Sequence, residues 1–172
     1  MTDPARLRRR GALAAVAAVV AAIDLVVKVW ARAALDGRAI DVGPLDLRLG
    51  YNSGVAFSLG DSAPTAVIVG VTGAITLGIA VAAWRLAPRT PRTFRFGLAA
   101  VLGGAVANLV DRAADGTVTD YLHTGWWPTF NLADVAICAG GALLVLGSVR
   151  TPSPQPRDRR TGSTAFREAP RV

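Results

Sequence analysis

The sequence contains four long apolar blocks, and their length most constrains how the chain can fold. They cover residues 11–30, 64–86, 96–110 and 135–149. The first block is interrupted only by Asp24 and Lys28, and the others are nearly free of charge. A helix needs about 20 mostly apolar residues to cross the hydrocarbon core of a bilayer. The first two blocks reach that length, so we expect a multi-pass membrane protein.

The third and fourth blocks are shorter, at about 15 residues each. At a rise of 1.5 Å per residue they extend roughly 22 Å, less than a hydrocarbon core of about 30 Å. To cross a membrane they must take their polar neighbours into it. These neighbours are Asn108, Asp111 and Arg112 on the third block, and Asn131 and Asp134 on the fourth. Ionisable groups at membrane depth are costly and are usually functional.

The composition agrees with a membrane protein. Its low charge and high apolar content exclude a disordered, collagen-like or coiled-coil chain. Hydrophobic residues make up 52% of the chain and charged residues 18%, against about 25% charged residues in soluble domains. The only cysteine, Cys138, cannot form an intrachain disulfide. With His123 as the only histidine, no ligand set for zinc is evident. We therefore expect neither a metal nor a cofactor.

The net charge of +7 arises from basic residues that cluster at alternate ends of the apolar blocks. Fourteen of the 19 Lys and Arg residues fall within 6–10, 85–95 and 150–171. The loops on the other side are rich in aspartate. By the positive-inside rule, both termini lie in the cytoplasm and the two acidic loops lie outside. The basic excess therefore reflects topology, and we expect no nucleic-acid partner.

The N-terminus allows a second interpretation. Residues 8–23 resemble a cleavable signal peptide, with 31–33 as a candidate cleavage site. However, Asp24 and Lys28 lie between the apolar core and that site, and their spacing places them on one helix face, where they can pair. We favour a helix that is retained.

These patterns predict an all-α membrane protein with a small extracytoplasmic β element and a second outer loop. The four transmembrane helices are expected at about 11–33, 64–86, 95–113 and 131–149. Together they form one domain, 1–150, and 151–172 is expected to be a disordered, basic cytoplasmic tail.

The β element is expected in the first outer loop. Apolar and charged residues alternate at 45–49, and a second alternation at 55–59 follows a turn signal at 52–54. The second outer loop, 111–129, contains a β-branched run at 117–119.

Carboxylates are the groups best placed for chemistry. Asp120 precedes the fourth helix and Asp134 begins it, so both are expected at similar depth. Two carboxylates that share one proton can act as acid and base in amide hydrolysis. The alternative is that these acids cap helices or pair with arginines, and for Asp111, beside Arg112, we favour that structural role. Ser53 lacks the surroundings of a nucleophile, and no His-Glu-x-x-His zinc motif occurs.

Five motifs follow one another along the chain. The first is the Asp-x-x-x-Lys pair of Asp24 and Lys28 on the first expected helix. The others are NSGVAFS at 52–58, GGAVANLVDR at 103–112, VTDY at 118–121 and FNLADVAI at 130–137. In this order they resemble the motifs of the lipoprotein signal peptidase (signal peptidase II) family, and the resemblance covers roughly residues 24–138.

The resemblance implies an intramembrane aspartic endopeptidase of the bacterial plasma membrane, with its active site at the outer face. Such an enzyme cuts diacylglyceryl-modified prolipoproteins just before the lipidated cysteine, so the implied partners are these substrates and membrane lipids, and we expect a monomer. The implied roles are catalysis for Asp120 and Asp134, substrate binding for Asn52, Gly54, Asn108, Arg112 and Asn131, and support for Asp24, Lys28 and Asp111.

The sequence departs from the family pattern at three positions. Val27, Ala107 and Val135 stand where the family often has Thr, Gly and Ser. None removes a proposed catalytic group, but the Ala107 methyl lies at an expected helix contact. A channel subunit or a non-catalytic assembly factor would explain the apolar blocks equally well. A channel, however, would carry its polar groups near mid-bilayer, and an assembly factor would need no aspartate pair.

The charge pattern predicts a definite topology. Reporter fusions after residue 10, within 88–93 and after 155 should report the cytoplasm, and fusions near 40 and 116 the outside. An outside signal from 88–93 would contradict the four-pass arrangement.

Overall fold

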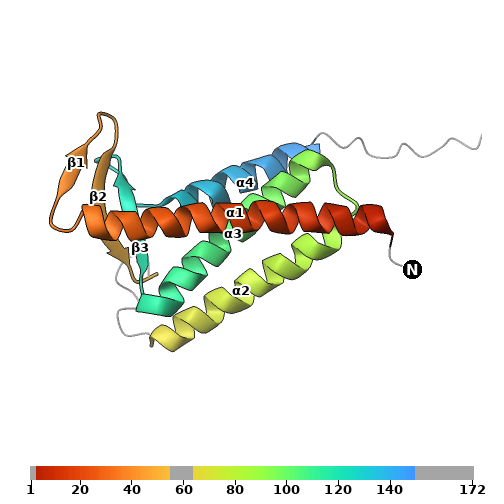
Figure 1. Cartoon of the computed structure of the whole chain (residues 1–172), viewed down its shortest axis with the longest axis horizontal. Helices are drawn as coiled ribbons and strands as arrows, with labels where there is room; N and C mark the ends of the chain where they lie inside the picture. The colour runs from red at the N-terminus through yellow and green to blue at the C-terminus, as the bar shows by residue number, and fades with distance from the viewer. Residues whose placement is uncertain (1–2, 55–63, 150–172) are drawn as a thin grey trace, which may run out of the picture.

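A computed structural model of the chain describes residues 3–54 and 64–149. Four helices run side by side, and a small sheet lies at one end of them (Figure 1). The helices are α1 (Pro4–Ala34), α2 (Thr65–Leu86), α3 (Arg92–Asp115) and α4 (Leu132–Val149). Their order and approximate bounds agree with the four predicted helices. The expected tail and the alternation at 55–59 lie outside the described residues.

The first helix begins earlier than its apolar block, at Pro4 rather than near residue 11. Asp3 is its N-cap, and the Asp3 side chain accepts a hydrogen bond from the backbone N–H of Ala5. Proline is favoured at the first helical position because that position needs no N–H donor. Residues 6–10, four of which are arginines, therefore belong to the helix. The capping residues at 3 and 4 determine where the helix begins, and hydropathy alone does not.

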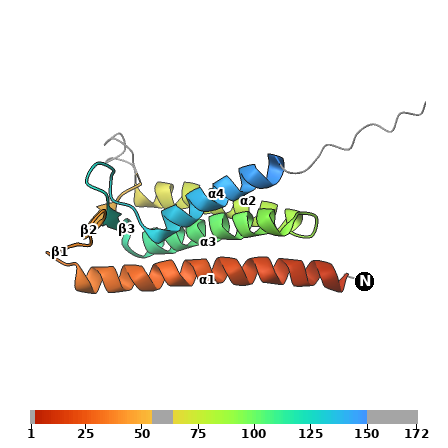
Figure 2. The same cartoon turned by 90° about the horizontal axis from the view of Figure 1, so that it is seen from above.

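Helix α3 is the centre of the bundle and contacts the other three helices (Figure 2). Small residues allow the close approach. Gly103 faces the backbone of α1, and an added Cβ would lie 2.6 Å from the Ala17 carbonyl oxygen. Gly104 faces α4, where an added Cβ would lie 2.5 Å from the Ala133 carbonyl oxygen. Small residues at such contacts are typical of helices packed within membranes.

The sheet joins the two predicted outer loops. Strands β1 (Ala39–Asp41) and β2 (Asp46–Asn52) come from the first loop, and β3 (Val118–His123) comes from the second. The order is β1-β2-β3 and both pairings are antiparallel. The strand expected at 45–49 is confirmed, whereas the second loop supplies a strand that the sequence analysis did not assign. Strand β3 forms because it pairs with β2, a segment far away in the sequence. The short β-branched run at 117–119 was not enough to predict that pairing.

Three helices within the described residues are long and apolar enough to cross a membrane, namely α1, α2 and α3. The apolar part of α4, Leu132–Ser148, is shorter. Many large apolar side chains on the helices are exposed, among them Val26, Ile75 and Val145. A multi-pass membrane protein explains this outward-facing apolar surface.

The contact between α3 and α4 gives a prediction on stability. Gly104→Ala should lower the thermal midpoint in detergent, because overpacking a tight contact costs about 1–3 kcal/mol. Gly141→Ala is the matched control, since an added Cβ there meets nothing within 4 Å. The control should be neutral or slightly stabilising, because alanine favours helix over glycine. Equal midpoints for the two variants would contradict the assigned packing.

Candidate active site

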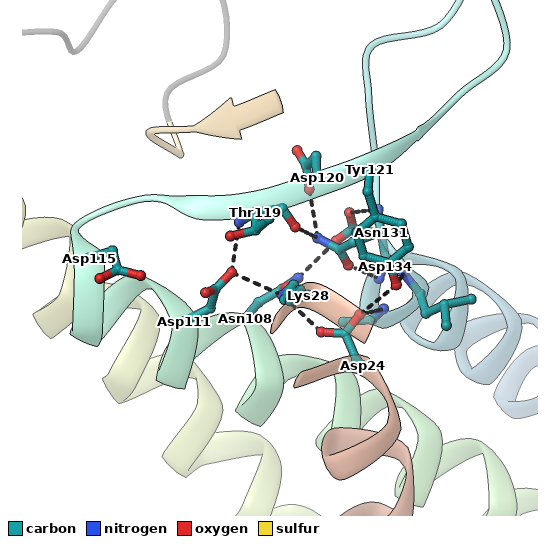
Figure 3. Close-up of polar contacts among 12 residues, drawn as sticks. Asp24, Lys28, Asn108, Asp111, Asp115, Thr119, Asp120, Tyr121, Asn131 and Asp134 are labelled. Carbon is teal, nitrogen blue, oxygen red and sulfur yellow. Dashed lines mark hydrogen bonds and ion pairs between the residues drawn. The ribbon is translucent and has the colours of Figure 1, made fainter. Parts of the chain in front are cut away.

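A buried ammonium group lies at the centre of the polar cluster where the sheet meets the helices (Figure 3). Lys28 and Asp24 are each 1% exposed, and Lys28 Nζ lies 2.8 Å from Asp24 Oδ2. The ammonium also lies 3.3 Å from Asp111 Oδ2 and donates a hydrogen bond of 2.7 Å to Asn108 Oδ1. The pairing of Asp24 with Lys28, expected from their spacing, is confirmed.

The other oxygen of Asp24 holds the start of α4. Asp24 Oδ1 accepts a hydrogen bond from the backbone N–H of Ala133 at 2.9 Å and one from the Tyr121 hydroxyl at 3.4 Å. The Tyr121 hydroxyl in turn accepts from the backbone N–H of Leu132 at 3.1 Å. The first N–H groups of a helix have no partner within the helix. Here α1 and β3 supply those partners, which fixes the start of α4.

Asn131 and Asp134 complete this helix start by capping one another. The backbone N–H of Asp134 donates to Asn131 Oδ1 at 3.0 Å, and that of Asn131 donates to Asp134 Oδ2 at 3.2 Å. This reciprocal pattern resembles a capping box. Asn108 Nδ2 donates to the other oxygen, Asp134 Oδ1, at 2.9 Å. The carboxylate of Asp134 is thereby held between α3 and its own helix.

Asp120 lies on β3 and is joined to Asp134 through Asn131. Its side chain is 2% exposed, and Oδ1 accepts a hydrogen bond of 2.6 Å from Asn131 Nδ2. Burial, reinforced by the charge of Asp134, raises the pKa of Asp120 to about 6. The hydrogen bonds from Asn131 and Asn52 and the charge of Lys28 oppose this rise in pKa.

Asp111 has partners that the sequence analysis did not foresee. It binds Lys28 and Arg32, and its Oδ2 accepts a hydrogen bond of 2.7 Å from the backbone N–H of Thr119. Arg32 also donates to Thr119 Oγ1 at 2.9 Å and lies 2.7 Å from Asp115. The expected pairing with an arginine is thus found, but on Arg32 of α1 and not on the adjacent Arg112.

Arg32 and Tyr121 are the site residues that sequence reasoning missed. Arg32 follows Lys28 by four positions, so one face of α1 carries Asp24, Lys28 and Arg32 in succession. That spacing was a usable signal. For Tyr121 the signal was weaker, since a tyrosine beside an aspartate on a strand does not indicate which helix end it meets.

The remaining predicted residues are Asn52 and Gly54 of the first outer loop and Arg112 of α3, and they lie close together. Asn52 Oδ1 accepts a hydrogen bond of 2.7 Å from the backbone N–H of Gly54. Gly54 has a φ of 86°, and an added Cβ would lie 2.8 Å from a terminal nitrogen of Arg112. Arg112 is 8% exposed, and among the described residues its Nε has no hydrogen-bond partner. This guanidinium is therefore buried with a donor unused.

The three departures from the family pattern fit the packing. Ala107 is fully buried against Ala21 and Ala133, so its methyl fills the contact that was in doubt. Val27 packs near Ala31 and Tyr121, and Val135 is 44% exposed. None of the three displaces a polar group of the site.

The arrangement links two carboxylates through Asn131, one from the middle of β3 and one from the first turn of α4. In the described ranges, no group of His, Cys, Asp and Glu side chains could hold a metal ion. An acid held with a raised pKa beside a second, hydrogen-bonded carboxylate suits acid–base chemistry.

Comparisons with known proteins agree with one family. Residues 16–150 match the family described as Signal peptidase (SPase) II. The chain is 39% identical to a lipoprotein signal peptidase of Rhodococcus jostii, over 84% of this chain and 75% of the relative. It is 37% identical to that of Mycobacterium leprae, over 87% and 75%.

A solved structure described as a bacterial membrane enzyme has the same fold. It superposes with a TM-score of 0.71 and 22% identity, over 83% of this chain and 95% of the other. The match to the family and the identity to its members lead to one conclusion: this chain belongs to the signal peptidase II family and is a protease of that family.

Proposed function

We propose that this chain is an intramembrane aspartic endopeptidase that removes the signal peptide from prolipoproteins, cutting before a diacylglyceryl-modified cysteine. Asp120 and Asp134 are the catalytic residues in this proposal. The observation that carries it is the link through Asn131, which donates to Asp120 and exchanges capping hydrogen bonds with Asp134. One amide side chain thereby holds two carboxylates from different elements in a common position.

The two carboxylates have different surroundings, and these suggest different roles. Asp120 is buried, and its pKa of about 6 lets its carboxyl group hold a proton to higher pH than an ordinary aspartate does. Both oxygens of Asp134 accept hydrogen bonds, Oδ1 from the Asn108 side chain and Oδ2 from the backbone N–H of Asn131. Asp120 therefore starts as the acid, and Asp134 starts as the base.

The reaction then balances with one shared proton. Asp134 takes a proton from water while the water oxygen attacks the scissile carbonyl carbon, and Asp120 gives its proton to the carbonyl oxygen. In the second step Asp134 protonates the leaving amide nitrogen as the C–N bond breaks. Asp120 recovers its proton from the hydroxyl that becomes the new carboxyl group. The pair ends in its starting state.

Arg112 and Gly54 are proposed to hold the substrate backbone. The buried Nε of Arg112 lacks a partner among the described residues, and a buried unsatisfied donor costs about 1–3 kcal/mol. A carbonyl of an extended substrate would satisfy that donor. Gly54 leaves room for it, since a side chain there would strike the guanidinium. Asn52, which hydrogen bonds to Asp120 and to Gly54, would keep this edge in place.

The proposed setting is a four-pass arrangement in the bacterial plasma membrane, with both termini in the cytoplasm. The site then faces the outer leaflet, from which a signal-peptide helix and its acyl chains can enter sideways. The exposed apolar surface of the helices supports such lateral access. We propose that the enzyme acts as a monomer without a cofactor, and that its partners are lipid-modified substrates and membrane lipids.

The catalytic assignment predicts the effect of two substitutions. Asp120→Asn and Asp134→Asn should each lower kcat on a lipidated prolipoprotein by at least about 10²-fold, because asparagine keeps the shape but cannot exchange the proton. Cleavage of the purified prolipoprotein, with and without its lipid, measures this loss and the preference for the lipidated form.

Asp41→Asn is the matched control for both variants. Asp41 lies on β1, and its Oδ1 accepts a hydrogen bond from the backbone of Gly43, which asparagine can also accept. The control should cleave at the rate of the unchanged protein. Retention of more than about a tenth of that rate by either dyad variant would contradict the assignment, since the loss would then be below the expected contribution of one acid–base group.

The raised pKa of Asp120 predicts a pH dependence. The acid must be protonated at the start, so kcat/KM should fall as the pH rises through about 6. Asn131→Ser should move this fall to higher pH. The reason is that serine can still cap α4, but it removes the hydrogen bond that lowers the pKa of Asp120.

The sign of the shift is the decisive measurement, because a merely structural loss would lower the rate equally at every pH. Profiles of kcat/KM between pH 4 and 9, about the titration range of a perturbed carboxyl group, give that sign. An alkaline limb that stays in place, or moves to lower pH, would show that Asp120 does not supply the proton.

A further inference from the structure

A cavity lies at the end of the helices away from the sheet, and the proposed peptidase chemistry does not use it. Its volume is about 560 Å³, and it opens between the first turns of α1 and α3. Four arginines line it, two from each helix: Arg8, Arg9, Arg92 and Arg95. Figure 1 shows the beginnings of both helices at this end, opposite the sheet.

Two of these arginines are held in place by the backbone between α2 and α3. Arg9 Nη1 donates to the Pro88 carbonyl at 2.6 Å, and Arg95 Nη1 donates to the Thr90 carbonyl at 2.7 Å. A guanidinium has five N–H donors, so each keeps others for a ligand. These bonds fix the two side chains without neutralising their charge.

Within residues 3–54 and 64–149, no carboxylate forms an ion pair with any of the four arginines. Asp3 is the described acid at this end of the helices, and it pairs with Arg6 at 3.5 Å. Helix α3 begins beside the cavity at Arg92, and its N-cap, Pro91, provides no side-chain hydrogen bond. The partial positive charge of a helix N-terminus adds to that of the arginines. The cavity thus presents an uncompensated positive field.

The rest of the cavity wall is apolar. Leu13 and Val16 contribute from α1, and Phe96 and Ala99 from α3. Leu13 and Ala99 are buried and belong to the core between these helices, whereas Phe96 is 54% exposed. The wall therefore runs from the arginines along the helices towards the exposed apolar surface. A small hydrophilic anion would gain no binding free energy from contact with this apolar wall.

The position of the cavity matches the opposite face of a membrane. Arg9 precedes Asp24 by 15 residues on one continuous helix, which is roughly 22 Å along its axis. Asp24 binds the backbone of Ala133, next to Asp134, so the cavity and this end of the site are separated by roughly three quarters of a hydrocarbon core of about 30 Å. In the proposed topology the cavity lies at the cytoplasmic leaflet.

We propose that this cavity binds an anionic phospholipid, with the phosphate between the arginines and an acyl chain along the apolar wall. Arginine matches phosphate oxygens through paired N–H donors. Topology alone would require positive charge at this end, but not a cavity that combines fixed guanidinium groups with an apolar wall. The proposal is independent of the catalytic residues, which lie at the other end of the helices.

Lipid binding by the full chain in nanodiscs tests the proposal. Phosphatidylglycerol with a spin-labelled acyl chain is titrated into phosphatidylcholine discs, and the immobilised fraction is measured by electron paramagnetic resonance. Arg92→Gln with Arg95→Gln should weaken binding at least about tenfold. Arg85→Gln with Arg89→Gln is the matched control, because it removes equal charge from the same end but from residues that do not line the cavity. The control should change affinity by at most about twofold.

Two further measurements distinguish a phospholipid site from a site for small anions and from general surface charge. Ala12→Leu narrows the cavity from an exposed position without changing charge, and it should also weaken binding. Excess glycerol 3-phosphate should not displace the labelled lipid. The proposal would be overturned if both double arginine variants lost the same affinity for phosphatidylglycerol, or if labelled phosphatidylcholine bound as tightly as labelled phosphatidylglycerol. It would also be overturned if Ala12→Leu bound the labelled lipid as tightly as the unchanged protein, or if glycerol 3-phosphate displaced that lipid. The same titration with Asp120→Asn should give unchanged binding, whether or not that residue proves catalytic.

Discussion

Burial of the Lys28 ammonium is the constraint on which the rest of the site depends. An unpaired charge at this depth would be strongly destabilising, since removing one partner of a buried pair costs about 3–5 kcal/mol. Lys28 contacts Asp24 on its own helix and Asp111 on α3, and Arg32 binds Asp111 in turn. Lys28 and Arg32 of α1 thus lie among Asp24 of the same helix and Asp111 and Asp115 of α3, and these ion pairs favour one alignment of α1 with α3.

The same groups determine where the aspartate pair lies. Asp24 holds the first N–H groups of α4 directly and through Tyr121, while Asp111 and Arg32 hold β3 at Thr119. The attachment of α4 to Asp24 and Tyr121 fixes the position of Asp134. The attachment of β3 at Thr119 fixes the position of Asp120. A shift of either element would break hydrogen bonds inside the buried cluster. Preorganisation of this kind is what the proposed acid and base require, since it holds them in position without motion at the moment of reaction.

Local patterns predicted much of this structure. The apolar blocks indicated the helices, the spacing of Asp24 and Lys28 indicated their pairing, and the position of Asp120 before an apolar helix start suggested its neighbour. The partners of Asp111 and the strand that contains Asp120 were not predictable in the same way. Both depend on contacts between segments about 70 to 80 residues apart, and hydrophobic periodicity carries no information on such pairings.

The shortness of the fourth apolar block has a structural reason that connects fold and site. Asp134 lies beside Asn108, which precedes the end of α3 at Asp115 by seven residues, or about 10 Å along the helix. Helix α4 therefore starts below the end of its neighbour, and the chain descends from β3 to reach it. A block of ordinary length would have carried Asp134 up to the sheet and towards water. The recessed start keeps Asp134 in the same buried cluster as Asp120, and the charge of Asp134 adds to the burial that raises the pKa of Asp120. A raised pKa on one of the two carboxyl groups is what the proposed sharing of one proton requires.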